Sequence, residues 1–306
     1  MNLSEDRAVA VANFIKLGQS LGIETATFRS ELGLFEGFLN DDVIFKYSLL
    51  DGYPWSYALQ DFLVTKIFRD STGAYAGTYV DVGANIGLIV IPIAEKTGLQ
   101  CYAFEPEPGN YSLLCRNIAA HQVEALIKTY PLALFSEKTL LPFELSSRNY
   151  GDHRIRPNQP SQVEKVYGEE KRQIIRVKAE KLDEILAAQQ LEKPIVVKVD
   201  IQGGEVHFAR GAARFLQSVD YLVMECWPYG LSYSGDTLDS FLEIMGQFPF
   251  AAAIGLVDRV RSVQVNLQPV EQVIKEIQDA VNLAQIDPDQ EINIVCSKHP
   301  RFPADM

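Results

Sequence analysis

Residues 80–90, VDVGANIGLIV, place an acid and two glycines at the end of an apolar run. Asp81 lies two residues before Gly83, and Asn85 separates Gly83 from Gly87. Glycines let a ligand approach the backbone closely, because no Cβ stands in the way. At the carboxyl end of a strand in an open α/β sheet, such a turn faces the ligand-binding crevice. Asp81 would repel pyrophosphate and attract an ammonium group, so we expect a ligand that carries an amine.

The spacing of this turn departs from two common phosphate-binding patterns. The dinucleotide fingerprint reads GxGxxG, whereas this turn reads Gly83-x-Asn85-x-Gly87 and continues with Leu88. The Gly-Lys-Ser/Thr of a phosphate-binding P-loop is also missing. A nicotinamide-dependent oxidoreductase shares the early acid and the glycines but lacks the third glycine at the needed spacing. It therefore stays an alternative of lower rank.

A second acid lies where a ribose-binding carboxylate is expected. Glu105, in the segment FEPEP, follows Gly83 by 22 residues at the end of the next apolar run. Dinucleotide sites place an acid for the ribose diol at about this distance from the glycine turn. An acid for an amine, an acid for a ribose and a close-approach turn together predict S-adenosylmethionine as the ligand.

The segment VVKVD places two ionisable residues in an apolar strand. Lys198 and Asp200 point to the same face because side chains alternate along a strand. They end that strand at the edge of the sheet where ligands bind. A hydroxyl acceptor of a methyl group must lose its proton, so Asp200 is a candidate base and Lys198 could tune its pKa. Glu205 begins the next helix and is a candidate for substrate binding.

A long polar segment, residues 146–178, interrupts the alternation of strands and helices. It holds eight basic residues against four acids in a chain of net charge −12. This contrast indicates salt bridges to the acidic body or, alternatively, an anionic substrate. Within it, His153 is a candidate base, and Asn149 and Arg154 could hold a polar acceptor. Trp227 could wall the pocket or stack on a ring or sugar.

Short apolar runs alternate with helical patterns after residue 77, which predicts a mostly parallel sheet covered on both faces. The N-terminal segment 1–76 is helical and aromatic and is expected to be an extension that serves as a lid or a subunit contact. Residues 77–306 form the predicted main domain. The expected strands are Thr78–Val82, Cys101–Phe104, Ile127–Leu132, Ile195–Val199, Tyr221–Met224, Ala251–Val257 and Glu291–Cys296.

The sequence resembles the FkbM family of S-adenosylmethionine-dependent methyltransferases. Four motifs that carry the resemblance stand in the expected order, and YLVMEC at 221–226 fits the strand that follows. The motifs are YVDVGANIG at 79–87, FEPEP at 104–108, NYGDHRI at 149–155 and VKVDIQGGE at 197–205. The resemblance covers residues 77–226, with Gly204 in place of the more usual Ala. The N-terminal 70 residues match nothing familiar.

The resemblance implies an α/β fold of the Rossmann-like class I methyltransferase type. Its sheet would have seven strands, mostly parallel, with one antiparallel strand near the edge. It also implies S-adenosylmethionine as the cofactor and transfer of a methyl group, usually to oxygen. Leu134, in PLALF, would lie near the adenine. The expected cofactor-binding residues are Asp81, Gly83, Asn85, Gly87, Glu105 and Leu134.

Composition narrows the class of protein. With 47% hydrophobic and 22% charged residues, the chain is an ordinary globular protein. Its charge of −12 argues against a nucleic-acid partner. No apolar run approaches the ~20 residues of a membrane span, and no signal core follows the N-terminus. The four cysteines show no metal or disulfide spacing, so we expect a cytoplasmic protein.

The acceptor is left open by the sequence. A small molecule, a sugar or a glycan precursor is expected, with O-methylation favoured. An N-methyltransferase is an alternative, although the Asn/Asp-Pro-Pro-aromatic motif of many amino methylases is missing. A non-catalytic module that kept the cofactor site is a third class. We expect no bound metal, because the sequence has no dense cluster of acidic residues. The sequence leaves open whether the chain forms a homo-oligomer.

Overall fold

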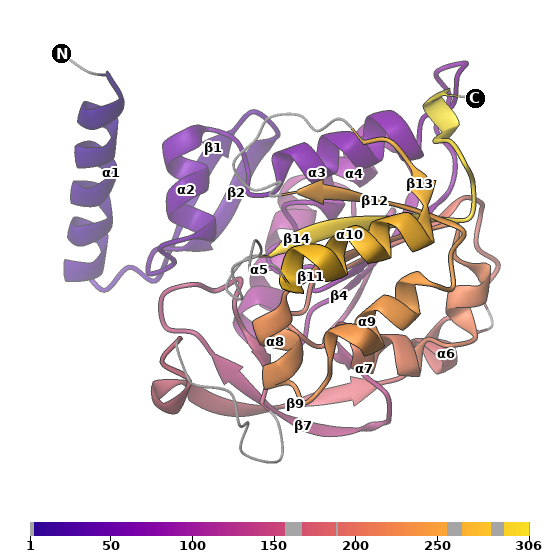
Figure 1. Cartoon of the computed structure of the whole chain (residues 1–306). Helices are drawn as coiled ribbons and strands as arrows, with labels where there is room; N and C mark the ends of the chain where they lie inside the picture. Colours follow the sequence, from indigo (N-terminus) through magenta and orange to yellow (C-terminus); the bar gives the residue numbers. More distant parts are fainter. Residues whose placement is uncertain (1–2, 157–166, 188, 256–264, 283–290, 306) are drawn as a thin grey trace.

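The computed structural model describes residues 3–156, 167–187, 189–255, 265–282 and 291–305. A central sheet has the strand order β13-β12-β14-β11-β10-β3-β4-β5 (Figure 1). These strands are β3 (Thr78–Val82), β4 (Gln100–Phe104), β5 (Ile127–Tyr130), β10 (Ile195–Val199), β11 (Tyr221–Cys226), β12 (Phe250–Gly255), β13 (Gln268–Pro269) and β14 (Ile292–Ser297).

The α/β class is confirmed, but the predicted count of seven strands is wrong. The described residues form eight strands in a mixed sheet, in which β5, β4, β3, β10 and β11 are parallel. β14 is antiparallel to β11 and β12, and β13 is antiparallel to β12. The extra strand is only two residues long and ends in Pro269. Proline cannot donate to a ladder and is confined to edges such as this one.

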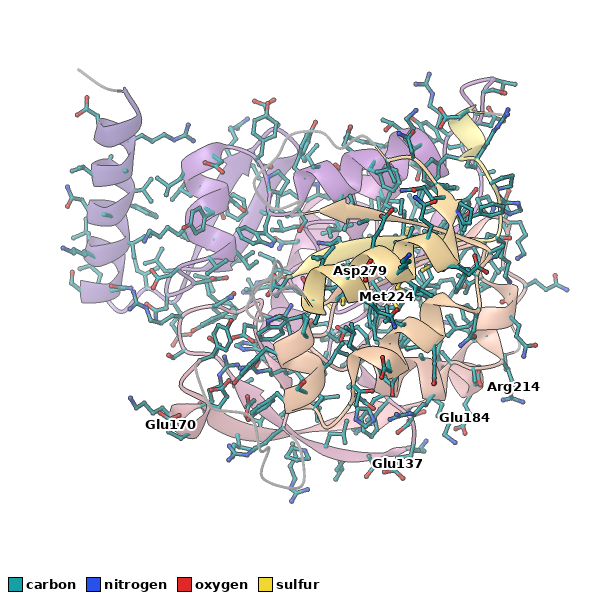
Figure 2. The ribbon with its side chains drawn as sticks, in the orientation of Figure 1. Glu137, Glu170, Glu184, Arg214, Met224 and Asp279 are labelled. Atoms are coloured by element: carbon teal, nitrogen blue, oxygen red, sulfur yellow. The ribbon has the colours of Figure 1, made fainter. Side chains whose placement is uncertain are left out.

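Alternating apolar residues let the sheet bury both faces. In β3, Tyr79 packs with one hydrophobic core and Val80 with the other. The first core holds α4 (Val90–Thr97) and α5 (Pro108–Ala120), and the second holds α7 (Glu205–Gly211), α9 (Leu238–Met245) and α10 (Val270–Asn282). Figure 2 shows Met224 of β11 in the interior, with Glu137, Glu184 and Arg214 towards the periphery.

The N-terminal segment packs on the first of these cores. Its aromatic residues Phe28, Phe35 and Phe45 are buried in the same cluster as α4. Figure 1 shows α1 at the outer side of this segment. The proposed division at residue 76 stays a prediction. The segment consists of α1 (Leu3–Ser20), β1 (Thr25–Ser30), β2 (Gly33–Phe38), α2 (Ile44–Asp51), α3 (Tyr57–Phe62) and a π-helical turn (Leu63–Ile67).

A second sheet, which the sequence analysis missed, combines two strands that precede the polar segment with two strands that come from it. Its order is β6-β9-β7-β8, and β7 and β9 run antiparallel at the lower edge of Figure 1. The strands are β6 (Ala133–Leu134), β7 (Thr139–Leu145), β8 (Arg154–Ile155) and β9 (Gln173–Glu180). Residues 157–166 of the polar segment lie outside the described residues.

Candidate active site

A pocket opens at the carboxyl ends of β3 and β10, where the strand order of the sheet changes direction. Such a switch point is the usual ligand site of an open α/β sheet. The pocket encloses about 1230 Å³ of space, counting its opening to solvent. Its lining comes from residues within 43–59, 81–89, 104–110, 132–134, 143–155 and 198–202, and from Glu225, Glu291 and Asn293.

The glycine turn after β3 is held in left-handed backbone conformations. Gly83 has φ +82°, and an added Cβ would lie 2.0 Å from the carbonyl oxygen of Asp200. Asn85 has φ +50° and donates through Nδ2 to the carbonyl of Tyr150 at 3.0 Å. Both residues line the pocket. The turn is therefore fixed against two neighbouring segments rather than left to solvent.

Gly87 belongs to the same turn but has a different reason for being glycine. Its φ is +95°, and an added Cβ would lie 2.6 Å from Ile91 and 2.9 Å from Leu114. These side chains belong to α4 and α5. Gly87 is not among the residues that line the pocket, so its position supports helix packing rather than direct ligand contact.

Glu105 lies at the end of β4 and faces the pocket. Its carboxylate accepts backbone N–H bonds from Asn85 at 2.9 Å and from Glu107 at 2.8 Å. Glu107 itself caps α5 by accepting from the N–H of Asn110. Burial raises the pKa of Glu105 to about 8, although the two backbone donors oppose this. Near neutral pH the group can thus both accept and donate hydrogen bonds.

Lys198 lies between two carboxylates. β10 pairs with β3 so that Lys198 stands beside Asp81. Its Nζ is 3.4 Å from Asp81 Oδ1 and 3.2 Å from Asp200 Oδ2. Burial alone would lower the pKa of Lys198, but the carboxylates of Asp200 and Asp81 hold it above its ordinary value. Burial raises the pKa of Asp81, and Lys198 partly offsets this.

Asp200 differs from Asp81 in exposure. The Asp200 side chain is 33% exposed, whereas that of Asp81 is 1% exposed. Its Oδ1 also accepts from Nε2 of Gln202 at 2.9 Å. Asp200 is thus reachable from the pocket while both of its carboxylate oxygens are held.

His153 also lines the pocket, together with Asn149. Its Nδ1 accepts the backbone N–H of Ser146 at 3.0 Å. Burial lowers the pKa of His153 to about 4, and the charge of Arg172 adds to this effect. The imidazole is therefore neutral at pH 7 and carries its proton on Nε2. In that form Nε2 is a hydrogen-bond donor and not a proton acceptor.

Arg154 and Trp227 lie outside the pocket lining, contrary to the role expected for them. Arg154 is fully buried and pairs with Glu144 at 3.1 Å and Glu169 at 2.7 Å. The Trp227 ring centroid lies 5.0 Å from its guanidinium carbon. The ring of Tyr233 lies at 4.9 Å. This group of residues, which we call the Arg154 cage, joins the second sheet to α8 (Pro228–Tyr233).

Glu205 also lies beside the pocket rather than on it. At the start of α7, it accepts the backbone N–H groups of Ile201 and Gly203 at 3.2 and 3.3 Å. Burial raises the pKa of Glu205 to about 7. Its contacts fix the turn that follows β10. Leu134, by contrast, does line the pocket and is buried in β6.

Several residues that line the pocket were not singled out from the sequence. Gln202 and Glu225 contact one another, with Nε2 of Gln202 2.8 Å from Glu225 Oε2. Gln202 lies inside the VKVDIQGGE motif, which was a signal that could have found it. Ser56 and Asn293 carried no such signal, because they come from distant parts of the chain.

The sequence profile described as the Methyltransferase FkbM domain matches residues 81–249, which is more than half of the chain. The chain belongs to the FkbM methyltransferase family. The family match spans the glycine turn, Glu105 and the Lys198–Asp200 strand. It confirms the resemblance given by the motifs and decides against a nicotinamide-dependent oxidoreductase.

Two curated methyltransferases resemble this FkbM chain. The hexuronic acid methyltransferase AglP of Haloferax volcanii is 27% identical over 146 residues, which cover 47% of this chain and 54% of AglP. The methyltransferase sdnD of Sordaria araneosa is 26% identical over 212 residues, covering 60% of this chain and 81% of sdnD. This chain thus spans about half of AglP and most of sdnD.

Among solved structures, a methyltransferase FkbM from Methylobacillus flagellatus KT is similar to 95% of this chain. The similarity covers 60% of that protein, with a TM-score of 0.41 and 14% sequence identity. TYW2 of P. horikoshii in complex with MeSAdo is similar with a TM-score of 0.41 and 10% identity, covering 90% of this chain and 72% of that protein.

Two further observations concern partners. None of the described helices is both long and apolar enough to cross a membrane. Within the described ranges, no group of three or more His, Cys, Asp and Glu side chains is arranged to hold a metal ion.

Proposed function

We propose that this chain is an S-adenosylmethionine-dependent methyltransferase that methylates a hydroxyl group of a small molecule, a sugar or a glycan precursor. The observation that carries the proposal is a shared pocket. Asp81 and Glu105 line it beside the glycine turn, and Lys198 and Asp200 line it at the end of the neighbouring strand. When bound, S-adenosylmethionine supplies a methyl group on a sulfonium that is already activated for transfer.

Asp81 fits the ammonium group of this cofactor. Its two carboxylate oxygens are buried, and Lys198 Nζ contacts Oδ1 at 3.4 Å, which is long for a hydrogen bond between charged groups. Buried polar groups in proteins are nearly always hydrogen-bonded, so a donor from a ligand would complete this carboxylate. Gly83 brings the backbone of this turn against Asp200, whose carbonyl oxygen would lie 2.0 Å from an added Cβ, so the ends of β3 and β10 meet at the pocket. Asp81 thus holds one end of the cofactor.

Glu105 fits the ribose hydroxyls. Two backbone N–H groups fix its carboxylate in the pocket, and a pKa near 8 lets it accept from one hydroxyl and donate to another. Leu134, with Phe104 beside it in the lining, offers an apolar surface for the adenine. These contacts would fix the direction in which the methyl group points. Such alignment can supply about 7–11 kcal/mol of the barrier reduction.

Asp200 is placed to receive the acceptor hydroxyl. It is the more exposed carboxylate of the Lys198 group, and it can accept the proton as the methyl group is transferred. Lys198 contacts Asp200 Oδ2 at 3.2 Å and so orients this carboxylate. His153 and Asn149 contribute from the other side, with Nε2–H of His153 as a donor to a second oxygen of the acceptor. This assigns His153 a binding role in place of the base role expected from sequence.

A neutral hydroxylated acceptor fits the pocket better than an anionic one. Two of the basic residues that suggested an anion are engaged elsewhere: Arg154 and Arg172 pair with Asp152 and Glu144. Within the described part of the lining, Lys198 is the cationic residue, and it already contacts two carboxylates. AglP is named a hexuronic acid methyltransferase, which supports the sugar class, although a hexuronic acid is itself an anion, so the acceptor panel includes both neutral and acidic sugars.

Calorimetric titration with S-adenosylhomocysteine tests the cofactor assignment. Wild type is expected to bind one equivalent, and Asp81→Asn is expected to weaken binding by about ten-fold or more, which is about 1.4 kcal/mol. The matched control is Asp239→Asn, an exposed acid on α9, which should bind as wild type does. Transfer of label from S-adenosylmethionine to a panel of neutral, acidic and amino sugars then tests the acceptor. Absence of binding to the wild type would overturn the proposal.

A further inference from the structure

Gln202 joins two carboxylates at the acceptor side of the pocket. Its Nε2 lies 2.9 Å from Asp200 Oδ1 and 2.8 Å from Glu225 Oε2. Parallel strands β10 and β11 are neighbours, so the two acids at their carboxyl ends come together there. All three side chains line the pocket.

The chemistry of this contact requires the amide nitrogen to face both acids. An ionised carboxylate only accepts hydrogen bonds, whereas a glutamine NH₂ offers two donors. One NH₂ group can therefore satisfy one oxygen of each acid at once. Two carboxylates held this close repel each other, and proteins commonly bring such pairs together with a cation. Here a neutral amide occupies the position between them.

The backbone at Gln202 supports a functional constraint. Its φ of +56° lies in the left-handed region, which residues other than glycine, asparagine and aspartate seldom adopt. The next residue, Gly203, has φ +98° and packs against the carbonyl of Gly230, 2.2 Å from where a Cβ would lie. Strained conformations of this kind persist where the surroundings hold them, commonly at functional sites.

We propose that Gln202 is a positioning residue that holds the Asp200 and Glu225 carboxylates in place for the methyl acceptor, in the position that a divalent cation would otherwise take. The inference rests on the proposed function, in which Asp200 faces the acceptor hydroxyl. Lys198 holds Oδ2 of Asp200 and Gln202 holds Oδ1, so side chains of this protein fix the orientation of this carboxylate from both sides.

The first test observes the side-chain NH₂ signals of Gln202 directly, by nuclear magnetic resonance of the wild-type protein. In a nitrogen-labelled sample, the side-chain NH₂ signals missing from Gln202→Leu identify Gln202. Both protons are expected downfield of the other glutamine side chains, because charge-assisted hydrogen bonds to carboxylates are strong. Asp200→Ala should return one of them to the ordinary position, and Glu225→Ala the other. Signals at ordinary positions, or signals that ignore Asp200→Ala, would overturn the proposal.

The second test creates the cation site that the amide replaces. Gln202→Glu puts a third carboxylate beside Asp200 and Glu225, and three carboxylates suit Mn²⁺. The variant is expected to bind one equivalent of Mn²⁺ in calorimetry, whereas wild type and Gln202→Leu should not. Adding Asp200→Asn to the variant should abolish that binding. If the wild type binds Mn²⁺ and loses it in Asp200→Ala, or if Gln202→Glu binds S-adenosylhomocysteine but no Mn²⁺, the inference is wrong.

The two proposals fail in different ways. If the inference about Gln202 is wrong, the amide signals and the Mn²⁺ titration reveal it, and neither measurement requires a methyl acceptor. If the proposed function is wrong, the wild type does not bind S-adenosylhomocysteine, while the amide signals of Gln202 stay as expected. Should Gln202→Glu not fold, the spectrum of the wild type still decides.

Discussion

Two buried cations of this protein, Lys198 and Arg154, stand in groups of carboxylates but do different work. Lys198 contacts Asp81 and Asp200, and this group lines the pocket. Arg154 contacts Glu144 and Glu169, each with no exposed side-chain surface, and aromatic rings cover its guanidinium.

The contrast shows that burial of a charge does not by itself mark a site. The Arg154 cage connects β7, β8 and α8, and its members contact one another rather than the pocket. The Lys198 group keeps one partly exposed carboxylate, that of Asp200, and one buried carboxylate, that of Asp81, which Lys198 contacts at 3.4 Å. Access from the pocket, rather than unmet hydrogen-bonding capacity, distinguishes the candidate site from the structural group, because Arg154 Nη1 and Trp227 Nε1 of the cage also lack hydrogen-bond partners among the described residues. Four substitutions can break or sharpen this distinction.

The largest expected effect is on stability, from Arg154→Met. The change leaves Glu169 buried without its arginine and leaves Glu144 with only the longer contacts to Arg156 and Arg172, both at 3.9 Å, and breaking a buried pair costs about 3–5 kcal/mol. Urea unfolding measures the loss. Arg148→Met is the matched control, because the Arg148 side chain is 80% exposed, and it should change the free energy of unfolding by no more than about 0.5 kcal/mol. If the folded fraction of Arg154→Met loses S-adenosylhomocysteine binding, the cage is part of the site after all.

Asp200→Asn should act on catalysis instead. Removing a proton acceptor typically lowers the rate about 10²–10⁴-fold, while the partly exposed position keeps the change in unfolding free energy below about 1 kcal/mol. Methyl transfer to an acceptor found in the sugar panel measures the first, and urea unfolding the second. A variant that retains most of its rate but unfolds easily would move Asp200 into the structural class.

Glu105→Gln should change how stability depends on pH. Burial raises the folded-state pKa of Glu105 to about 8 from an ordinary 4.5. A carboxyl with a raised pKa favours the folded state at low pH, and this contribution is lost as pH rises towards 8. The variant lacks that titration, so its unfolding free energy relative to wild type should rise between about pH 5 and about pH 8.5, by up to about 4 kcal/mol. A pH-independent difference between the two proteins would contradict the raised pKa.

The smallest expected effect is that of His153→Ala. A donor to the acceptor is lost, which typically costs about 0.5–1.5 kcal/mol and lowers the methyl-transfer rate about three- to ten-fold. The shape of the rate profile between about pH 6 and about pH 8 should stay as in wild type, because the imidazole is neutral throughout this range. Disappearance of an ionisation near pH 6.5 would instead make His153 the base.

The central sheet could be predicted because its strands carry strong local signals. β-Branched runs such as IVVKV are short, apolar and bounded by turns, as buried parallel strands are. The second sheet carries weaker signals. β6 and β8 are two residues long, β7 contains Pro142, and Ile174 of β9 is 49% exposed. Pairing between β7 and β9 depends on contacts across residues 146–172, which local patterns do not reveal.

The candidate site was predictable where residues lie at strand ends, and less so elsewhere. Asp81, Glu105, Lys198 and Asp200 converge because neighbouring parallel strands end at one edge. The direction of Arg154 follows from alternation along a strand: its neighbours His153 and Ile155 line the pocket, and Arg154 faces away. Gln202 and Ser56 depend on a left-handed turn and on the packing of a distant segment.

The position of β14 has a consequence for synthesis on the ribosome. β14 lies between β11 and β12 although it follows both in sequence. Until Ile292–Ser297 leave the exit tunnel, β12 lacks its neighbour and β11 keeps an open edge on that side. Asn293 of the pocket also arrives with this strand. The nascent chain can thus build β3, β4, β5, β10 and β11 early, yet it completes the pocket only after β14 has been made.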